Sequence, residues 1–310
     1  MRAPTRRPTA DRGGGLENVS GTSAEQRGDL IQVSDVWYWY NSDVAALKGV
    51  SLNIDAGETV AIIGQNGGGK TTLAKHFNGL LKPSKGEVYV KGYNTKETPI
   101  HVLASIVAYV FQNPSHQIFM STVYDEVAYG PLQQGLPKPL VDERVAKALE
   151  IVGLSVNPKT HPYDLDYGQM KLLTIASAIA ADPEAFVLDE PTTGQDHRAR
   201  RRVAEIVRQL NRIGKTVVVI THDMRFVAET AARTVVMVDG KIVADGPTRE
   251  IMSNVELLAS ASIKPPQTVQ LAQGLREHGY NLNMLTLDEA VEELKRLLGC
   301  RRSSNPSPVF

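Results

Sequence analysis

The chain has 310 residues, of which 42% are hydrophobic and 22% charged, and this is ordinary for a globular protein with a sizeable core. Its 34 basic residues are balanced by 34 acidic ones. Proteins that bind nucleic acid usually carry a basic footprint, so the charge excludes nucleic acid as the default partner. The single cysteine, Cys300, excludes an internal disulfide framework and favours a reducing compartment. No apolar run approaches the ~18 residues of a membrane span, so we expect a cytosolic chain that acts at a membrane only through a partner.

The first part of the chain divides by composition. Residues 1–28 are rich in Arg, Gly, Thr and Ser and contain few apolar residues, which is typical of a disordered tail. After them IQVSDVWYWY (31–40) alternates as a strand does, and VSLNI (50–54) predicts a second short strand. The folded core is therefore expected to begin at residue 29.

Three later segments, TVAIIG (59–64), AFVLDE (185–190) and TVVVITHD (216–223), predict short buried strands, with helical stretches between them. This alternation is typical of a parallel sheet in an α/β domain, which we place over residues 29–255. Residues 113–182 lack such strands and predict an inserted helical subdomain.

The composition changes again over residues 256–310. KPPQ (264–267) predicts a linker or a helix start, and TVQLAQGL after it is helical in pattern. Thr286 and Glu289 form a capping box, and apolar residues recur behind it at helical spacing. A small helical C-terminal extension is expected.

The segment GQNGGGKT matches the phosphate-binding P-loop, follows the strand TVAII and opens the predicted helix KTTLAKHFNGLL (70–81). Its glycines permit positive φ and a tight wrap, so that backbone N–H groups and the helix N-terminus surround the β-phosphate of ATP. We expect Lys70 to neutralise charge on the β- and γ-phosphates and the Thr71 hydroxyl to ligate Mg²⁺. A dinucleotide fingerprint would need glycine at Asn66, so that alternative fails. The residues assigned to the nucleotide here are Gly64, Gln65, Asn66, Gly67, Gly68, Gly69, Lys70, Thr71 and Thr72.

A P-loop requires a carboxylate on a neighbouring strand to hold Mg²⁺. Asp189 ends the strand AFVLD and is the expected ligand, and Glu190 beside it is the expected general base for the attacking water. The alternative is a capping or salt-bridged carboxylate pair.

Four further signals are weak singly: Tyr40 before the core strands, Gln112 after IVAYVF, PTTGQD (191–196), and THD (221–223). In this order they resemble the ATP-binding cassette (ABC) family, the ATPase subunits of ABC transporters, over about residues 30–250. The resemblance implies that Tyr40 stacks on adenine, that Gln112 contacts Mg²⁺ and the attacking water, and that His222 reaches the γ-phosphate. It also implies that Asp196 lies in the loop that crosses a dimer interface.

Two segments, FQNPSHQIF (111–119) and TVYDEVAYGP (122–131), narrow the resemblance to the ATPases of energy-coupling factor transporters, as do SIKPPQTVQLAQGL (262–275) and LTLDEA (285–290). Those systems import vitamins and transition-metal ions such as cobalt and nickel. The resemblance implies a head-to-tail ATPase dimer with nucleotide at its interface, a groove near 112–131 that grips helices of an integral membrane partner, and a place on the cytoplasmic face of the membrane.

The segment His161–Gln169 would be the family's signature loop, Leu-Ser-Gly-Gly-Gln, which contacts the nucleotide of the opposite chain. Leu165, Gly168 and Gln169 match, whereas Asp166 replaces Ser and Tyr167 replaces Gly. An ionised Asp cannot donate to a phosphate, and two unit charges ~4 Å apart repel by about 4 kcal/mol at an effective dielectric near 20. We therefore expect a weakened site on the partner's P-loop and favour a heterodimer with a second ABC ATPase. The alternative is a homodimer in which Asp166 turns aside and the Gly168 N–H suffices.

Two other functions remain open from the sequence. A soluble ABC protein of DNA repair or translation usually carries long coiled-coil insertions or two cassettes, and this chain has neither. A nucleotide-binding regulatory module with negligible hydrolysis would not need Glu190. The basic run HRARRR (197–202) is expected to be a solvated helix face rather than a nucleic-acid site.

Overall fold

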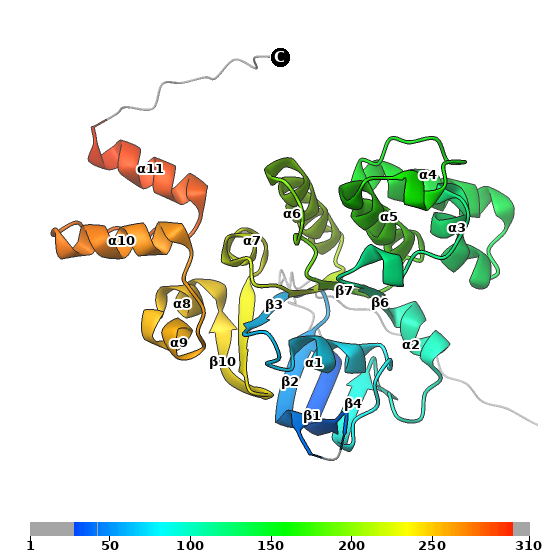
Figure 1. The fold of residues 1–310 in the computed structure, drawn as a ribbon, viewed down its shortest axis with the longest axis horizontal. Coiled ribbons are helices and arrows are strands. Elements are labelled where there is room, and N and C mark those ends of the chain that lie inside the picture. The colour runs from blue at the N-terminus through cyan, green and yellow to red at the C-terminus, as the bar shows by residue number, and fades with distance from the viewer. Residues whose placement is uncertain (1–27, 42, 300–310) are drawn as a thin grey trace, which may run out of the picture.

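The computed structural model describes residues 28–41 and 43–299, so nearly all of the predicted tail, 1–28, lies outside the described residues. Two β-sheets form its centre (Figure 1). The strands in chain order are β1 (Asp29–Trp39), β2 (Ala45–Asp55), β3 (Thr59–Gly64), β4 (Lys85–Val90), β5 (Tyr93–Asn94), β6 (Val107–Val110), β7 (Ala185–Asp189), β8 (Thr216–Ile220), β9 (Arg233–Val238) and β10 (Lys241–Pro247).

The larger sheet has the order β10-β9-β3-β8-β7-β6. Its pairs are parallel except for β10 with β9. Every residue of β3, β7 and β8 is buried, because both faces of the sheet are covered, and this explains their unbroken apolar sequences. The three predicted strands are therefore confirmed as neighbours, and their carboxyl ends meet at one edge.

The smaller sheet is antiparallel, in the order β2-β1-β4-β5. The predicted segment 31–40 lies in β1 except for Tyr40, which follows the strand, and the segment 50–54 lies in β2. No strand was expected over β4, β5, β9 and β10. Lys, Gly, Asp and Pro in β4 and β10 disfavour a strand locally. Pairing with β1 nevertheless buries Val88 and Val90 of β4, so tertiary packing outweighs the local preference.

Helices cover both sheets. In chain order they are α1 (Lys70–Phe77), α2 (Ile100–Ile106), α3 (Val123–Gln133), α4 (Lys138–Val152), α5 (Tyr167–Ala180), α6 (His197–Arg212), α7 (Met224–Thr230), α8 (Thr248–Ser253), α9 (Val255–Ser260), α10 (Gln267–Glu277) and α11 (Leu287–Leu297), with short 3₁₀ turns η1 (Pro114–His116) and η2 (Pro162–Asp164).

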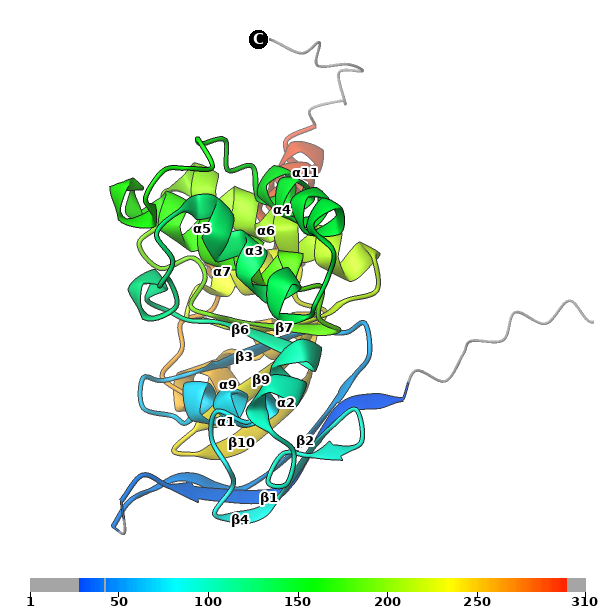
Figure 2. The same ribbon diagram turned by 90° about the vertical axis from the view of Figure 1, so that its right-hand side faces the viewer.

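The molecule is layered (Figure 2). Helix α1 lies between the two sheets, where Leu73 and Phe77 join a core shared by both. Helices α3, α4 and α5 form the expected helical region within 113–182 and pack on the opposite face of the larger sheet. Helix α1 ends at Phe77, four residues earlier than predicted, because Asn78 and Gly79 (φ +73°) leave the helical conformation.

The C-terminal helices α10 and α11 stand apart from the sheets, beyond α8 and α9 (Figure 1). Helix α10 begins directly after Pro266, and α11 has the predicted Thr286–Glu289 capping box. Leu287 and Val291 on the apolar face of α11 are 48% and 43% exposed. Within the described ranges, none of these helices combines the length and the apolar character that crossing a bilayer requires.

Candidate functional site

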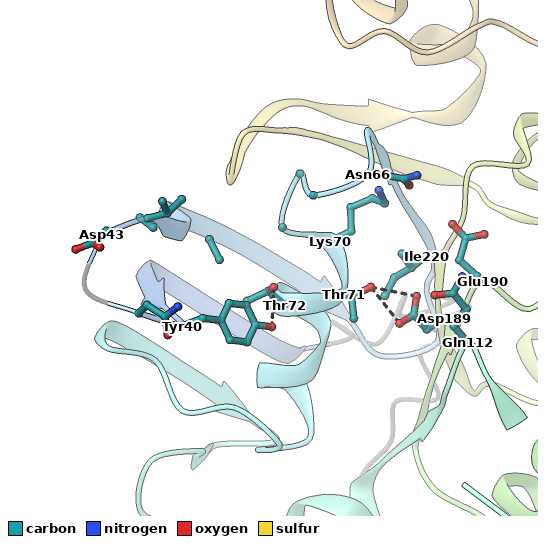
Figure 3. A pocket seen from close by; sticks show the side chains of 17 residues that line it. Tyr40, Asp43, Asn66, Lys70, Thr71, Thr72, Gln112, Asp189, Glu190 and Ile220 are labelled. Carbon is teal, nitrogen blue, oxygen red and sulfur yellow. Dashed lines mark hydrogen bonds between the residues drawn. The ribbon is translucent and has the colours of Figure 1, made fainter. Parts of the chain in front are cut away.

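A cleft of about 650 Å³ opens where the larger sheet ends, beside the smaller sheet. It is lined by the loop after β1, the loop that joins β3 to α1, and the ends of β6 and β7. Figure 3 shows Tyr40 at one end, Gln112, Asp189 and Glu190 at the other, and Thr71 between them. Of the predicted site, the cleft therefore gathers Tyr40, Asn66, Gly67, Gly68, Gly69, Lys70, Thr71, Thr72, Gln112, Asp189 and Glu190.

The glycine-rich loop forms a cradle that larger residues would fill. Gly69 has φ +93°, and a Cβ there would lie 2.6 Å from the carbonyl oxygen of Ala46. A Cβ at Gly64 would lie 2.0 Å from the carbonyl oxygen of Met237. Gly64, Gly67 and Gly69 adopt the positive φ that glycine permits; Gly68 does not, and a Cβ there would meet the carbonyl oxygen of Gln65 at 3.0 Å. The Gly68 N–H donates within the loop, to the carbonyl oxygen of Gln65 at 3.1 Å, and Gly67, Gly68 and Gly69 line the cleft just before α1 begins. The start of a helix beside such a cleft is where a phosphate would bind.

Lys70 is buried, and its ammonium donates to the carbonyl oxygens of Gly64 (2.8 Å) and Gln65 (2.7 Å). Burial lowers the pKa of Lys70, and the negative charges of Glu190 and Asp189 act in the opposite direction. The cation is thus held against the loop that would enclose a phosphate, and it lines the cleft.

Two oxygen-bearing side chains suited to Mg²⁺ meet in the cleft. The Thr71 hydroxyl donates to Asp189, with Oγ1 3.1 Å from Oδ2. The Tyr109 hydroxyl donates to the same Oδ2 at 2.8 Å. Burial raises the pKa of Asp189, and the hydrogen bonds from Tyr109 and Thr71 oppose the rise. A hydroxyl, a carboxylate and the exposed Gln112 amide form an all-oxygen donor set of the kind that Mg²⁺ prefers, so the residues fit the ion.

Glu190 follows β7 in an unusual conformation. Its φ is +47°, which for a non-glycine residue costs about 1–2 kcal/mol. Its Oε1 lies 2.8 Å from Nδ1 of His222, and its Oε2 accepts from the hydroxyls of Thr193 (3.2 Å) and Thr221 (3.3 Å). The surrounding structure therefore holds this carboxylate in one orientation at the rim of the cleft.

Tyr40 lies at the other end of the cleft. Its side chain is 57% exposed, and its hydroxyl is 3.1 Å from the Thr72 Oγ1 (Figure 3). Its ring packs edge-on against Tyr38 at 5.0 Å. An exposed ring held at one edge has a face available for stacking, as adenine would require.

The predicted signature loop lies outside the cleft of its own chain. Asp166 caps α5: its Oδ1 accepts from the Gln169 N–H at 2.8 Å, and the Gln169 Oε1 accepts from the Asp166 N–H at 3.2 Å. The carboxylate thus occupies the helix end that would otherwise face an anion, and its charge offsets the positive end of the helix dipole.

Tyr167 joins the signature loop to two neighbouring loops. Its hydroxyl donates weakly to the Gln112 carbonyl oxygen at 3.4 Å, and its ring lies beside Gly194. Asp196 caps α6 through the Ala199 N–H at 2.7 Å. His222 lines an adjoining cleft with Asp223 and Arg225. Gly64, Gln65, Asp166–Gln169, Asp196 and His222 are thus the predicted site residues that do not line the first cleft.

The basic run 197–202 is only partly the solvated face that was predicted. Arg198 and Arg201 are exposed. Arg200 is buried and pairs with Asp223 (3.8 Å) and Glu229 (3.7 Å). Arg202 donates to the last carbonyl groups of α4, including that of Ile151 at 2.8 Å. Two of these arginines are therefore occupied inside the fold.

Sequence reasoning missed Tyr109 and Lys171. Tyr109 is the one hydroxyl in the apolar strand β6, and Lys171 is the one charge in the apolar run of α5. A polar group at a buried position needs a partner, and that signal could have identified both residues.

The fold and the cleft together define a P-loop nucleotide-binding protein. A family profile described as "ABC transporter" matches residues 47–193. A putative ABC transporter ATP-binding protein of Caldanaerobacter subterraneus subsp. tengcongensis is 44% identical over 267 residues, which cover 86% of this chain and 46% of that protein. The energy-coupling factor transporter ATP-binding protein EcfA of Methanothermobacter thermautotrophicus is 40% identical over 274 residues, which cover 87% of this chain and 88% of that protein. The chain belongs to the family of ATP-binding cassette (ABC) transporter ATPases.

Solved structures agree. The structure of cbiO1 from Clostridium perfringens, described as part of the ABC transporter complex cbiONQ, has a TM-score of 0.68 and 30% identity and covers 79% of this chain and 99% of that one. A dimeric ATP-binding cassette described as a post-hydrolysis state bound to ADP and Pi has a TM-score of 0.64 and 28% identity, with 70% and 98% covered. The fold class and the family resemblance are thereby confirmed. The chain spans about half the length of some curated relatives and most of the length of others.

Proposed function

We propose that this chain is the ATP-hydrolysing subunit of a membrane transporter, of the energy-coupling factor type, that imports a vitamin or a transition-metal ion. The observation that carries the proposal is the cleft itself: a glycine cradle, a buried lysine, a Thr71–Asp189 pair and an oriented Glu190 converge in one place. A binding module needs the cradle, but only a hydrolase needs the carboxylate held beside it.

The proposed chemistry follows from that geometry. Bound Mg²⁺ would neutralise phosphate charge, held by Thr71, Asp189 and Gln112. The Glu190 carboxylate would accept a proton from the attacking water, and its hydrogen bonds to His222 and two threonines fix its direction. Lys70 and the loop N–H groups would stabilise charge on the β- and γ-phosphates.

A head-to-tail dimer is part of the proposal. The signature loop does not line the cleft of its own chain, and a similar cassette forms a dimer with bound ADP and Pi. The loop would then act on the partner's nucleotide. ATP would close the pair, and hydrolysis would reopen it.

We favour a partner that is a second, different ATPase, with a homodimer as the other possibility. Asp166 places a capping carboxylate where the family has Ser, so the site built on this loop would bind ATP weakly. The intact P-loop, Asp189 and Glu190 of this chain would work with an ordinary signature loop from the partner.

The membrane partner would dock at residues 112–131. Phe119 is 62% exposed, and its ring packs edge-on against Tyr129 at 4.9 Å. This aromatic pair offers an apolar contact for helices of an integral membrane subunit, which would place the chain peripherally on the cytoplasmic face. The relatives described as an energy-coupling factor ATPase and as part of cbiONQ support the importer class.

The test measures which proteins purify with this chain and how fast the purified complex hydrolyses ATP. Affinity purification from detergent-solubilised native membranes is expected to recover a membrane protein and a second ATPase whose signature loop contains Ser. In that complex Glu190→Gln should lower kcat by about 10²-fold or more while ATP still binds. Recovery of this chain with the membrane protein alone would mean a homodimer. Recovery of no membrane protein, or full turnover by Glu190→Gln, would contradict the transport role or the assigned base.

A further inference from the structure

Lys171 is a fully buried cation that the nucleotide chemistry described above does not use. It lies in the second turn of α5, and its side chain has 0% exposure. Its Nζ donates to the main-chain carbonyl oxygen of Glu190 at 2.6 Å. Burial lowers the pKa of Lys171 to about 8, with Asp189 and Glu190 acting in the opposite direction. A buried charge is costly unless it is paired, so packing alone does not explain a lysine here: methionine would fill the same space without that cost.

The group that Lys171 holds is the one with an unusual backbone. Glu190 has φ +47°, its N–H donates to the carbonyl oxygen of Ile220 at 2.8 Å, and its own carbonyl oxygen accepts from Lys171. The residue is thus clamped on both sides of its Cα. A strained backbone persists only where its surroundings hold it. Lys171 supplies the shorter of two hydrogen bonds to the Glu190 carbonyl oxygen, which also accepts from the Thr193 N–H at 3.4 Å.

The signature loop lies at the N-terminus of the helix that carries Lys171, α5. Helix α5 starts at Tyr167 and is capped by Asp166, so Lys171 lies four residues, or about 6 Å of helix rise, from the first helical residue. Lys171 therefore links the first turns of α5 directly to the main chain of Glu190.

We propose that Lys171 is a positioning residue that sets the Glu190 carboxylate for hydrolysis and ties it to α5, so that contact of the signature loop with the partner's nucleotide adjusts the chain's own site. The inference rests on the proposed function, because Glu190 must be the base for its position to matter. The two nucleotide sites of a dimer would thus be connected from the signature loop through α5 and Lys171 to Glu190.

The first experiment uses the purified ATPase dimer or transporter complex with Lys171→Met, and with Lys171→Arg as the conservative rescue. Lys171→Met is expected to lower kcat at least tenfold, to leave the Kd of a fluorescent ATP analogue within about twofold, and to leave Tm unchanged or raised. Lys171→Arg should recover most of kcat. A Met variant with normal kcat would overturn the proposal. So would equal loss of ATP affinity and Tm in both variants, because that is the behaviour of a purely structural residue.

The second experiment tests the route. Mixed dimers carry Glu190→Gln on the partner copy, or its equivalent on a different partner ATPase, so that only the cleft of this chain turns over. Gln169→Ala, at the α5 cap, then alters the signature loop that faces the partner's nucleotide, and its effect is read as turnover in the cleft of this chain. We expect Gln169→Ala to lower turnover when Lys171 is present and to add no further loss to Lys171→Met. Effects that multiply as independent changes would refute the coupling. Wild-type dimers that fail to hydrolyse ATP would instead refute the proposed function.

Discussion

The Nδ1 atom of His222 lies 2.8 Å from Oε1 of Glu190, and this contact joins the ends of two adjacent parallel strands. The register pairs Asp189 of β7 with Ile220 of β8, so the residues that follow each strand are brought side by side. The His222 side chain is 67% exposed and that of Glu190 only 9%. The histidine thus lies over the carboxylate and holds it from the solvent side.

The first prediction concerns this histidine. His222→Ala should lower kcat by about 10²-fold, because the Glu190 carboxylate loses the partner that orients it. The affinity for ATP should change little, since the P-loop is untouched. Steady-state turnover and equilibrium binding of a fluorescent ATP analogue measure the two effects. Unchanged kcat would show that the hydrogen bond does not contribute to hydrolysis.

Tyr109→Phe should weaken Mg²⁺ binding. The hydroxyl fixes the Asp189 oxygen that Thr71 also contacts, and loss of such a supporting hydrogen bond typically costs 10–100-fold in metal affinity. The measurement is nucleotide binding as a function of Mg²⁺ concentration. Tyr89→Phe is the matched control, because the Tyr89 hydroxyl contacts Glu87 away from the cleft. Equal curves for the two variants would contradict a role for Tyr109 in the metal site.

Replacements of Asp166 separate its capping role from its charge. Asp166→Ala should cost about 1 kcal/mol in the free energy of unfolding, because the Gln169 N–H loses its acceptor. Asp166→Ser keeps a cap and adds a hydroxyl donor, so stability should stay within about 0.5 kcal/mol while turnover at the partner's P-loop rises. Urea unfolding and turnover of the dimer report the two effects. No gain from Asp166→Ser would favour the alternative in which Asp166 does not weaken the site.

Arg202→Met should destabilise the fold by about 1–3 kcal/mol, because three carbonyl groups at the end of α4 each lose a hydrogen bond from the guanidinium. Arg201→Met removes the same charge from an exposed position and should change stability by less than about 0.5 kcal/mol. Denaturant unfolding compares the pair. Equal stabilities would mean that the α4 contacts are replaced by water without cost.

Acid should destabilise the protein through His76. The imidazole ring of His76 is fully buried, and its Nδ1 lies 2.7 Å from the carbonyl oxygen of Thr72. Burial lowers the pKa of His76 from 6.5 to about 4. Because the unfolded chain takes up the proton first, this contribution to stability is present above pH 6.5 and is lost as pH falls toward 4, by up to about 3 kcal/mol.

The control for this prediction is the exposed His116. Unfolding measured between pH 7 and 4 should show a shallower decline in His76→Gln than in the wild type, and an unchanged decline in His116→Gln. Parallel curves for all three proteins would assign the acid sensitivity to other groups.

Much of the nucleotide site could be predicted because it is local in the chain. Residues 64–72 form a loop and the start of one helix, and their glycine and lysine spacing carries the chemistry. Asp189, the expected metal ligand, ends an apolar strand that its own sequence predicts. The Asp166–Gln169 capping box has the same three-residue spacing as the predicted Thr286–Glu289 box, so the sequence carries the signal for it as well.

The sequence by itself determined the P-loop, the three buried strands β3, β7 and β8 and the family, because each depends on short-range patterns of residue type. Only the tertiary structure decided which groups contact Asp189 and Glu190: the Tyr109 hydroxyl reaches the Asp189 carboxylate across 80 residues, and Lys171 reaches the Glu190 carbonyl oxygen across 19. Those pairings follow from strand register and from how α5 packs on the sheet, and both depend on contacts between distant segments. A hydroxyl or ammonium group at a position predicted to be buried indicates that it needs a hydrogen-bond partner, whereas the fold decides which partner it has.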